Sequence, residues 1–207
     1  LIFNNDAPEA YAGEDQFWCT PISTTVLAAD APETPGTGTW TLQSGMGTIA
    51  NPNNPNTNLS GLTIGENIFC WTVYNGPCEE PTTDCVSIFI YDENHPEADA
   101  GDDIEVCLPI STVVLGGTPA IFPAFGTWQL LSGQGTIAEV NNPNSIVSGL
   151  ALGENTFVWT INNSPCVAGN SSDTVSVFVF EEGINAAFAG SDQSFCSPTD
   201  LTILSAA

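Results

Sequence analysis

Two stretches of this chain have almost the same sequence and are separated by a fixed number of positions. GTWTLQSGMGTIANPNNPN begins at Gly38, and GTWQLLSGQGTIAEVNNPN begins at Gly126, which is 88 positions later. A fixed interval of this kind is typical of tandem structural units, so we expect consecutive beads rather than one shared core. The same interval separates five landmark residues from their copies: Cys19, Trp40, Leu62, Trp71 and Cys78 return as Cys107, Trp128, Leu150, Trp159 and Cys166.

The repeat also predicts the boundaries of the units. A third copy of the opening motif, AGSDQSFCSPTD, begins at Ala189, and the first residues of the chain align with the end of a copy. We therefore interpret the chain as part of a longer array. The expected units are the end of a preceding repeat over 1–9, repeat 1 over 10–92, repeat 2 over 93–181, and the start of repeat 3 over 182–207.

The local pattern within each copy is that of β-strands. In NTFVWTIN the residues Phe157, Trp159 and Ile161 alternate with Val158 and Thr160, which is the period of a half-buried strand. Short segments of this kind are separated by turn sequences such as SGMG, NPNNPN and NGP. The expected fold class is all-β, with tandem immunoglobulin-like β-sandwich domains of seven strands that contain intradomain disulfides.

The charge of the chain excludes several classes of partner. The sequence has 24 Asp and Glu residues and no Lys or Arg, which gives a formal net charge of −24. Binding to a phosphate backbone needs Lys and Arg, so nucleic acid is excluded as a partner. An anionic membrane surface would repel the chain. With no run of 18 apolar residues, direct membrane insertion is not expected.

The seven cysteines predict disulfides and an oxidising compartment. Cys19 is expected beside the first strand of its copy and Cys78 in the loop after the Trp71 strand, and the second copy repeats this relation. We therefore expect Cys19–Cys78 and Cys107–Cys166 bridges, each closing a loop of about 60 residues and contributing roughly 4 kcal/mol. Cys196 is expected to pair with a residue beyond position 207.

Two further cysteines occur only in the first copy. Cys70 and Cys85 stand where the second copy has Val158 and Thr174. Their parity in the two strands points both side chains away from the face of Trp71. We expect them to form a cross-strand bridge on the outer face of a hairpin.

The remaining conspicuous side chains have mainly structural interpretations. The four repeated tryptophans are expected to form the sandwich core rather than a sugar-stacking surface. Trp18, which Val106 and Phe195 replace, is also interpreted as a packing position, and His95 as a lone surface residue. Because no Lys, Arg or second His is present, a general base or an activated nucleophile is hard to assemble, so no enzymatic activity is expected.

The acidic residues allow two interpretations. Asp15, Asp103 and Asp192 precede each first strand, and Glu66 and Glu154 recur in GEN, which is typical of carboxylates that cap turns. The alternative is a calcium site at a junction, since calcium prefers clustered carboxylate oxygens. The acid-rich linker YDENHPEADAGDD supplies its candidate ligands, Asp92, Glu93, Asp99, Asp102 and Asp103.

Two kinds of surface feature remain as minor candidates. Three positions match the generic N-glycosylation pattern: Asn58, Asn162 and Asn170. The Asn- and Thr-rich NPNNPN turns are interpreted as loop chemistry, with a polar edge for ligand contact as the alternative.

Taken in order, the motifs AGxDxxxC, GTW, SGxGTIA, NNPN, SGLxxGENxFxWT, NxPC and DTVSV resemble the Ig-like or PKD-like repeats of giant surface proteins of Bacteroidota. That family is exported by the type IX route and includes gliding-motility adhesins. The resemblance covers nearly the whole chain and implies display on a bacterial cell surface, adhesion and a filamentous stalk. It also implies O-glycosylation at Thr174, because Asp173-Thr174-Val175 matches the pattern of Asp, hydroxyl residue and apolar residue.

Three functional hypotheses follow. In the first, each repeat is a rigid, acidic, disulfide-closed bead of a long extracellular stalk for adhesion or gliding, and its partners are the neighbouring repeats of the same chain. In the second, each repeat is itself a module that binds surface glycans or proteins through its loops. In the third, repeats of several chains assemble side by side into an extracellular filament.

Overall fold

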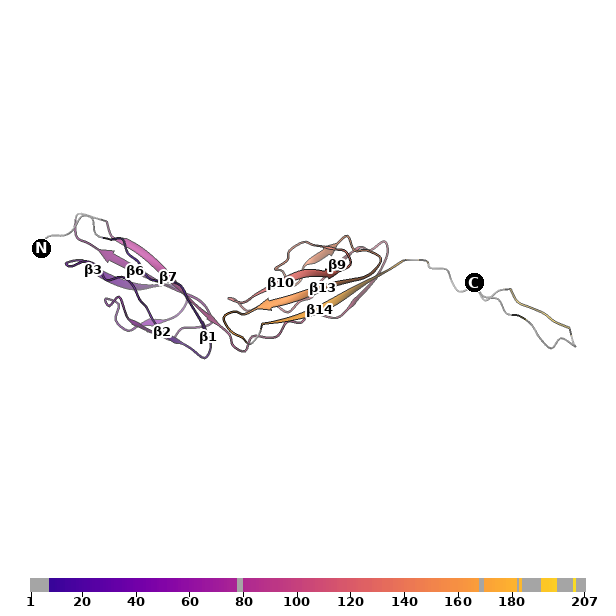
Figure 1. Cartoon of the computed structure of the whole chain (residues 1–207), viewed down its shortest axis with the longest axis horizontal. Helices are drawn as coiled ribbons and strands as arrows, with labels where there is room; N and C mark the ends of the chain where they lie inside the picture. Colours follow the sequence, from indigo (N-terminus) through magenta and orange to yellow (C-terminus); the bar gives the residue numbers. More distant parts are fainter. Residues whose placement is uncertain are drawn as a thin grey trace.

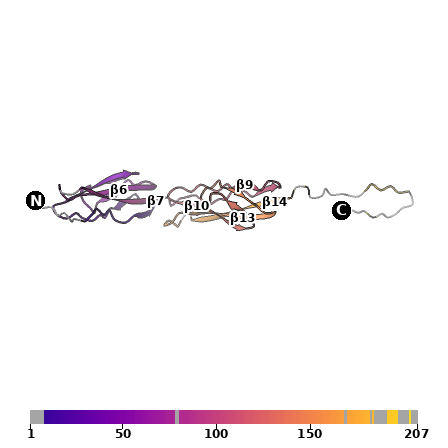
Figure 2. The same ribbon diagram turned by 90° about the horizontal axis from the view of Figure 1, so that it is seen from above.

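A computed structural model describes residues 8–77, 80–167, 170–181, 183, 191–196 and 203. Within these residues the chain forms fourteen β-strands and no helix. The described part therefore contains no helix long and apolar enough to span a membrane. The strands form two separate sandwiches that lie end to end along the longest axis of the molecule (Figure 1). The view from above shows the same arrangement (Figure 2). The all-β tandem fold expected from the repeat is confirmed.

Each sandwich consists of a four-stranded and a three-stranded sheet, in the same order. The first sandwich contains β1 (Gln16–Cys19), β2 (Thr24–Val26), β3 (Thr37–Ser44), β4 (Thr48–Ile49), β5 (Asn58–Ser60), β6 (Gly65–Tyr74) and β7 (Thr82–Tyr91). The second contains β8 (Ile104–Cys107), β9 (Thr112–Val114), β10 (Phe125–Ser132), β11 (Thr136–Ile137), β12 (Ile146–Ser148), β13 (Gly153–Asn162) and β14 (Ser171–Phe180). The orders are β1-β7-β6-β3 over β2-β5-β4, and β8-β14-β13-β10 over β9-β12-β11.

One strand pair in each sandwich is parallel, and it places the cysteines. The first strand of each unit runs alongside the last, with Cys19 opposite Tyr91 and Cys107 opposite Phe180. All other pairs are antiparallel. A cysteine at the end of the first strand therefore lies at the end of the sandwich from which the chain leaves for the next unit.

The core of each sandwich is built around a tryptophan pair. Trp40 faces Trp71 with ring centroids 5.2 Å apart, and Trp128 faces Trp159 at 5.0 Å. All four side chains are at most 2% exposed, which confirms their prediction as core residues. Each pair belongs to its own cluster of buried residues, so the two units have separate cores.

The glycine of the repeated GTW motif makes room for this pair. A Cβ atom built at Gly38 would lie 2.0 Å from Cζ2 of Trp71, and one at Gly126 would lie 2.0 Å from Cζ2 of Trp159. Real Cβ atoms do not approach another carbon so closely, so any side chain here would displace the core tryptophan. The motif therefore records a packing constraint.

The Asn-rich turn is fastened to the same core. The side-chain amide of Asn53 donates to the Gly38 carbonyl at 3.1 Å, and the Trp40 indole N–H donates to the Pro55 carbonyl at 3.2 Å. The second sandwich repeats both bonds through Asn141 and Pro143. These contacts support the interpretation of the NPNNPN turns as loop chemistry.

The asparagine of the repeated GEN motif is buried, a role that its residue type and spacing do not predict. Asn67 is 1% exposed and joins three segments. Its amide donates to the carbonyls of Thr63 at 3.0 Å and Ile88 at 3.2 Å, and its Oδ1 accepts from the Met46 N–H at 2.9 Å. Asn155 plays the same part in the second sandwich. The asparagine of each GEN motif thus maintains a hydrogen-bond network inside its sandwich.

Candidate functional site at the junction

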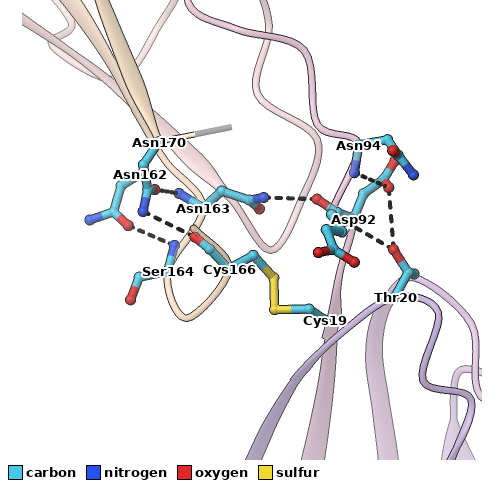
Figure 3. The surroundings of a disulfide bond; sticks show 10 residues. Cys19, Thr20, Asp92, Asn94, Asn162, Asn163, Ser164, Cys166 and Asn170 are labelled. Atoms are coloured by element: carbon cyan, nitrogen blue, oxygen red, sulfur yellow. Dashed lines mark hydrogen bonds between the residues drawn. A yellow bond between two sulfur atoms is a disulfide. The ribbon is translucent and has the colours of Figure 1, made fainter. Parts of the chain in front are cut away.

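A disulfide and a group of hydrogen bonds lie where the two sandwiches meet (Figure 3). The first sandwich contributes the ends of β1 and β7 and the start of the linker. The second contributes the loop after β13 and the loop between β9 and β10. We call this set the junction, and its principal residues are Cys19, Thr20, Phe89, Asp92, His95, Ile121, Phe122, Asn163 and Cys166.

A disulfide crosses the junction. Cys19 is bonded to Cys166, with their Cα atoms 5.7 Å apart and 147 positions between them in the sequence (Figure 3). The predicted Cys19–Cys78 and Cys107–Cys166 bridges are therefore wrong. The bond joins two units, whereas the repeat led us to expect one closed loop within each unit.

Strand direction explains the error. Gly65 of β6 pairs with Ile90 and Val73 pairs with Thr82, so β6 ends at the opposite end of the sandwich from Cys19. The loop that follows β6 in the same unit is thus far from Cys19, and Cys78 itself lies outside the described residues. By contrast, β13 ends next to the first sandwich, so the loop that follows it presents Cys166 to Cys19 (Figure 1).

The other predicted cysteine sites have different outcomes. Cys70 and Cys85 lie opposite each other on β6 and β7 and form a disulfide, with their Cα atoms 4.0 Å apart. Cys107 is exposed and has no disulfide partner among the residues that the structure describes. A partner for Cys196 beyond residue 207 stays a prediction.

A buried asparagine adds a hydrogen bond across the junction. Asn163 is fully buried, and its side-chain amide donates to the Asp92 carbonyl at 2.8 Å (Figure 3). The loop that carries it is shaped by Asn170, whose amide donates to the Cys166 carbonyl at 3.0 Å and whose Oδ1 accepts from the Asn163 N–H. The loop therefore presents the sulfur and the amide to the first sandwich together.

The start of the linker is fixed from the side of the first sandwich. The Thr20 N–H donates to the Tyr91 carbonyl at 2.9 Å, and the Thr20 hydroxyl accepts from the Glu93 N–H at 2.9 Å. The carboxylate of Asp92 accepts from the Asn94 N–H at 2.9 Å. These bonds hold the linker against the residue that follows the bridging Cys19.

His95 is part of the junction. The prediction of a surface histidine is wrong, because the ring is only 5% exposed. Its Nε2 accepts from the Ile121 N–H at 2.7 Å, and its Nδ1 lies 2.7 Å from the Pro96 carbonyl. Since Nε2 accepts a hydrogen, the ring carries its proton on Nδ1 and donates it to Pro96. A single linker histidine gives no sequence sign of this, because its partner is a backbone amide.

Aromatic rings complete the contact. Phe89 stacks on Phe17 with centroids 5.2 Å apart, and Phe122 of the second sandwich meets Phe89 edge-on at 6.4 Å. Trp18 is not buried in either core, contrary to its interpretation as a packing position. It is 37% exposed, and its indole N–H donates to the Gln16 side chain at 3.1 Å, whereas its counterpart Val106 packs against the second core.

The repeated acids accept hydrogen bonds from the last strand of each sandwich. Asp15 and Glu66 accept from the N–H and the hydroxyl of Ser87, both at 2.8 Å. Asp103 and Glu154 accept in the same way from Ser176, again at 2.8 Å. These carboxylates therefore serve as internal acceptors, as expected, but they bind groups of a strand and do not cap a turn.

The five candidate calcium ligands do not come together. Among the described residues, no three acidic, His or Cys side chains form a group that could hold a metal ion. The carboxylates of Asp92, Asp99 and Asp103 instead accept from the backbone N–H groups of Asn94, Gly101 and Ser176. The linker thus spreads Asp92, Glu93, Asp99, Asp102 and Asp103 along its length. It uses Asp92 and Asp99 for its own backbone, whereas Asp103 accepts from Ser176 of β14.

The candidate glycosylation sites differ in their surroundings. Thr174 is exposed on β14, and its neighbour Asp173 accepts from the Ala100 N–H at 2.8 Å. Asn58 is exposed on β5. Asn162 and Asn170 are exposed as well, but the amide of Asn170 is engaged by the Cys166 carbonyl. Modification at all four positions stays a prediction.

An open polar hollow of about 540 Å³ lies beside the loop that carries Cys166. Neutral side chains of β13, β14 and the loop between them line it, and they are mostly hydroxyls and amides. Its lining comprises Thr160, Ile161, Asn162, Ser164, Asn170, Ser171 and Ser172.

Comparison with known proteins gives likenesses of fold alone. No family model and no curated protein matches the chain. The PKD domain from the KIAA 1837 protein is 26% identical with a TM-score of 0.37, over 44% of this chain and 91% of that one. A PKD domain of human KIAA0319 is 25% identical with a TM-score of 0.35, over 41% and 80%. The titin Ig tandem A164–A165 is 12% identical with a TM-score of 0.44, over 85% and 98%.

The class of the molecule follows from its own strand order. In each unit the second, fifth and fourth strands form one sheet, and the first, seventh, sixth and third form the other. This is the layout of an immunoglobulin-like sandwich whose first strand has joined the sheet of the last strand. The molecule is thus a tandem of two immunoglobulin-like sandwiches.

Proposed function

We propose that this chain is a segment of a load-bearing extracellular stalk, in which tandem sandwiches supply reach and stiffness rather than chemistry. The observation that carries the proposal is the Cys19–Cys166 bond across the junction. A bridge inside one sandwich stabilises that sandwich alone. A bridge between consecutive sandwiches also fixes how they are placed relative to each other.

The junction has two covalent connections. One is the linker between the end of β7 and the start of β8, and the other is the disulfide. Tandem domains joined by a single linker are expected to move relative to each other unless their interface is large and apolar. A second connection removes much of this freedom, and the bonds of Asn163 and His95 oppose what remains. Stiffness is therefore the property that this arrangement favours.

The disulfide also shortens the path along which tension travels. Force applied at the two ends of the chain enters at Cys19 and crosses directly to Cys166. Residues 20–165 lie inside the closed loop, so unfolding them does not lengthen the molecule. The 147-residue separation corresponds to about 500 Å of extended chain that tension does not release.

Charge and redox chemistry fit a place outside the cell. Disulfides persist in oxidising compartments, and this chain has one within a sandwich and one between sandwiches. The 24 acidic residues, with no Lys or Arg, make successive units repel each other and resist collapse of the array. The finer part of the proposal is a stalk for surface adhesion or gliding on a bacterial cell. It rests on the resemblance of the repeat motifs to those of Bacteroidota surface proteins.

Single-molecule force spectroscopy tests the mechanical role. The oxidised protein, held at its two ends, should extend only through residues outside the loop. Reductant should release about 500 Å more. The matched control is the Cys19→Ser/Cys166→Ser double variant, which should release this length without reductant, except for the roughly 50 Å held by Cys70–Cys85. An oxidised protein that extends to the full length of its chain would contradict the proposal.

A binding role for each sandwich is the competing proposal, and the polar hollow lined by Asn, Ser and Thr favours it. A glycan array probed with the whole chain separates the two. Saturable binding that Ser172→Trp in the hollow abolishes would favour the binding module. The stalk would be favoured if no glycan binds and if the oxidised protein extends under force only through residues outside the Cys19–Cys166 loop.

A further inference from the structure

Cys107 occupies the same place in the second sandwich as the bridging Cys19 does in the first. Cys19 is paired in parallel with Tyr91, and Cys107 with Phe180. The N–H of the next residue, Thr20 or Leu108, donates to that partner's carbonyl at 2.9 Å in both units.

The turn after each cysteine also closes in the same way. The N–H of Ile22 donates to the Cys19 carbonyl at 3.1 Å, and the N–H of Ile110 donates to the Cys107 carbonyl at 3.1 Å. The backbone that presents the sulfur is therefore already formed at Cys107, although no described residue is bonded to it.

The surroundings of Cys107 differ from those of Cys19 in an informative way. Glu105 replaces the stacking residue Phe17, and Leu108 replaces Thr20 with its linker-holding hydroxyl. The aromatic stack and the hydroxyl contact of the first junction therefore do not recur at the far end of the second sandwich. The presented sulfur is retained while the contacts around it change.

We propose that Cys107 is the attachment site for a further sandwich of this type, which bonds to it through a cysteine in the loop after its sixth strand. This inference rests on the proposed function and extends it, because it makes the bridge between sandwiches a recurrent joint. The ligand is a thiol in the position that Cys166 holds here. The Cys19–Cys166 bond is the independent observation that a cysteine in this setting takes such a partner.

The bond forms by thiol–disulfide exchange with a low-molecular-weight disulfide as oxidant. The Cys107 thiolate attacks one sulfur of the oxidant and releases one thiol, which leaves a mixed disulfide on Cys107. The partner's thiolate then attacks the Cys107 sulfur and releases the second thiol. Two cysteine thiols are oxidised to one disulfide, and the oxidant is reduced to two thiols.

A second copy of the chain serves as the probe. Cys78 holds the sequence position of Cys166, 88 places earlier, so each copy contains both halves of the proposed joint. The whole chain carrying Cys196→Ser is reduced mildly, mixed at high concentration with oxidised glutathione, and analysed by non-reducing electrophoresis and peptide mapping. The expected product is a head-to-tail ladder that links Cys107 of one copy to Cys78 of another. Cys107→Ser should lower the linked fraction at least tenfold.

The other outcomes count against the proposal. Symmetric Cys107–Cys107 dimers would show an unspecific exposed thiol, and a stable glutathione adduct without a ladder would show that a like sandwich is not the partner. Neither result touches the proposed function, because the force response depends on Cys19 and Cys166. A Cys19–Cys166 bond that forms normally in the Cys107→Ser variant verifies that this variant is folded.

Discussion

Single residues in this molecule are constrained most strongly where the tryptophan pair meets the backbone. Gly126 has no space for a side chain, whereas a Cβ at Gly116 in the same sandwich would meet nothing within 4 Å. The sequence pointed to the tryptophans as core, but it could not distinguish these two glycines, because the difference lies in how a ring from β13 crosses β10.

The two glycines provide a matched test of this packing. Gly126→Ala should lower the free energy of unfolding of the second sandwich by about 3 kcal/mol, because the new methyl group displaces the Trp159 ring. Gly116→Ala should be neutral or slightly stabilising, since it reduces the freedom of the unfolded chain. Urea denaturation followed by tryptophan fluorescence measures both. Equal effects of the two substitutions would contradict this view of the core.

At the scale of elements, the alternation of apolar and polar residues along the strands predicted the fold but not the disulfide at the junction. Alternation correctly placed Trp71 inward, and it paired Cys70 with Cys85 on the neighbouring strand. It said nothing about the parallel pairing of β1 with β7, and this pairing carries Cys19 to the end of the sandwich where the next unit begins. The repeat interval cannot distinguish a bond within a unit from a bond between units, because both kinds of bond would join the same two repeated cysteine positions. The junction roles of His95 and Asn163 were hidden for a different reason, because their partners are backbone groups that no residue type marks in the sequence.

The hairpin bridge of the first sandwich provides a second matched test. The double variant Cys70→Val/Cys85→Thr carries the residues that the second sandwich has at these positions. Without the bridge over 15 positions, the first sandwich should lose about 3 kcal/mol of stability and keep its fold. Calorimetry should show that the unfolding transition of the first sandwich moves to a lower temperature, while that of the second sandwich stays where it is. A collapse of both transitions would mean that the two cores are not independent.

At the scale of the whole molecule, a bond between units has a consequence that bonds within units lack. The Cys19–Cys166 loop spans nearly two sandwiches, and a second loop that began at Cys107 would overlap it. In an array built this way, loops would interlock along the fibre, so that tension on one unit passes to the next through sulfur as well as through the linker. The junction, rather than any surface of a single sandwich, is the part of the molecule that distinguishes a stiff stalk from a flexible string of domains.

Disulfide mapping of the native, unreduced protein decides whether this joint exists. The chain has no Lys or Arg, so trypsin cannot cut it. A protease specific for acidic residues is combined with chymotrypsin, which cuts at Trp71 and Tyr74 between Cys70 and Cys78, and the peptides are identified by mass spectrometry. The expected linked peptides join Cys19 to Cys166 and Cys70 to Cys85. Peptides that join Cys19 to Cys78 and Cys107 to Cys166 would instead place each bridge inside one sandwich, and the locked junction would have to be abandoned.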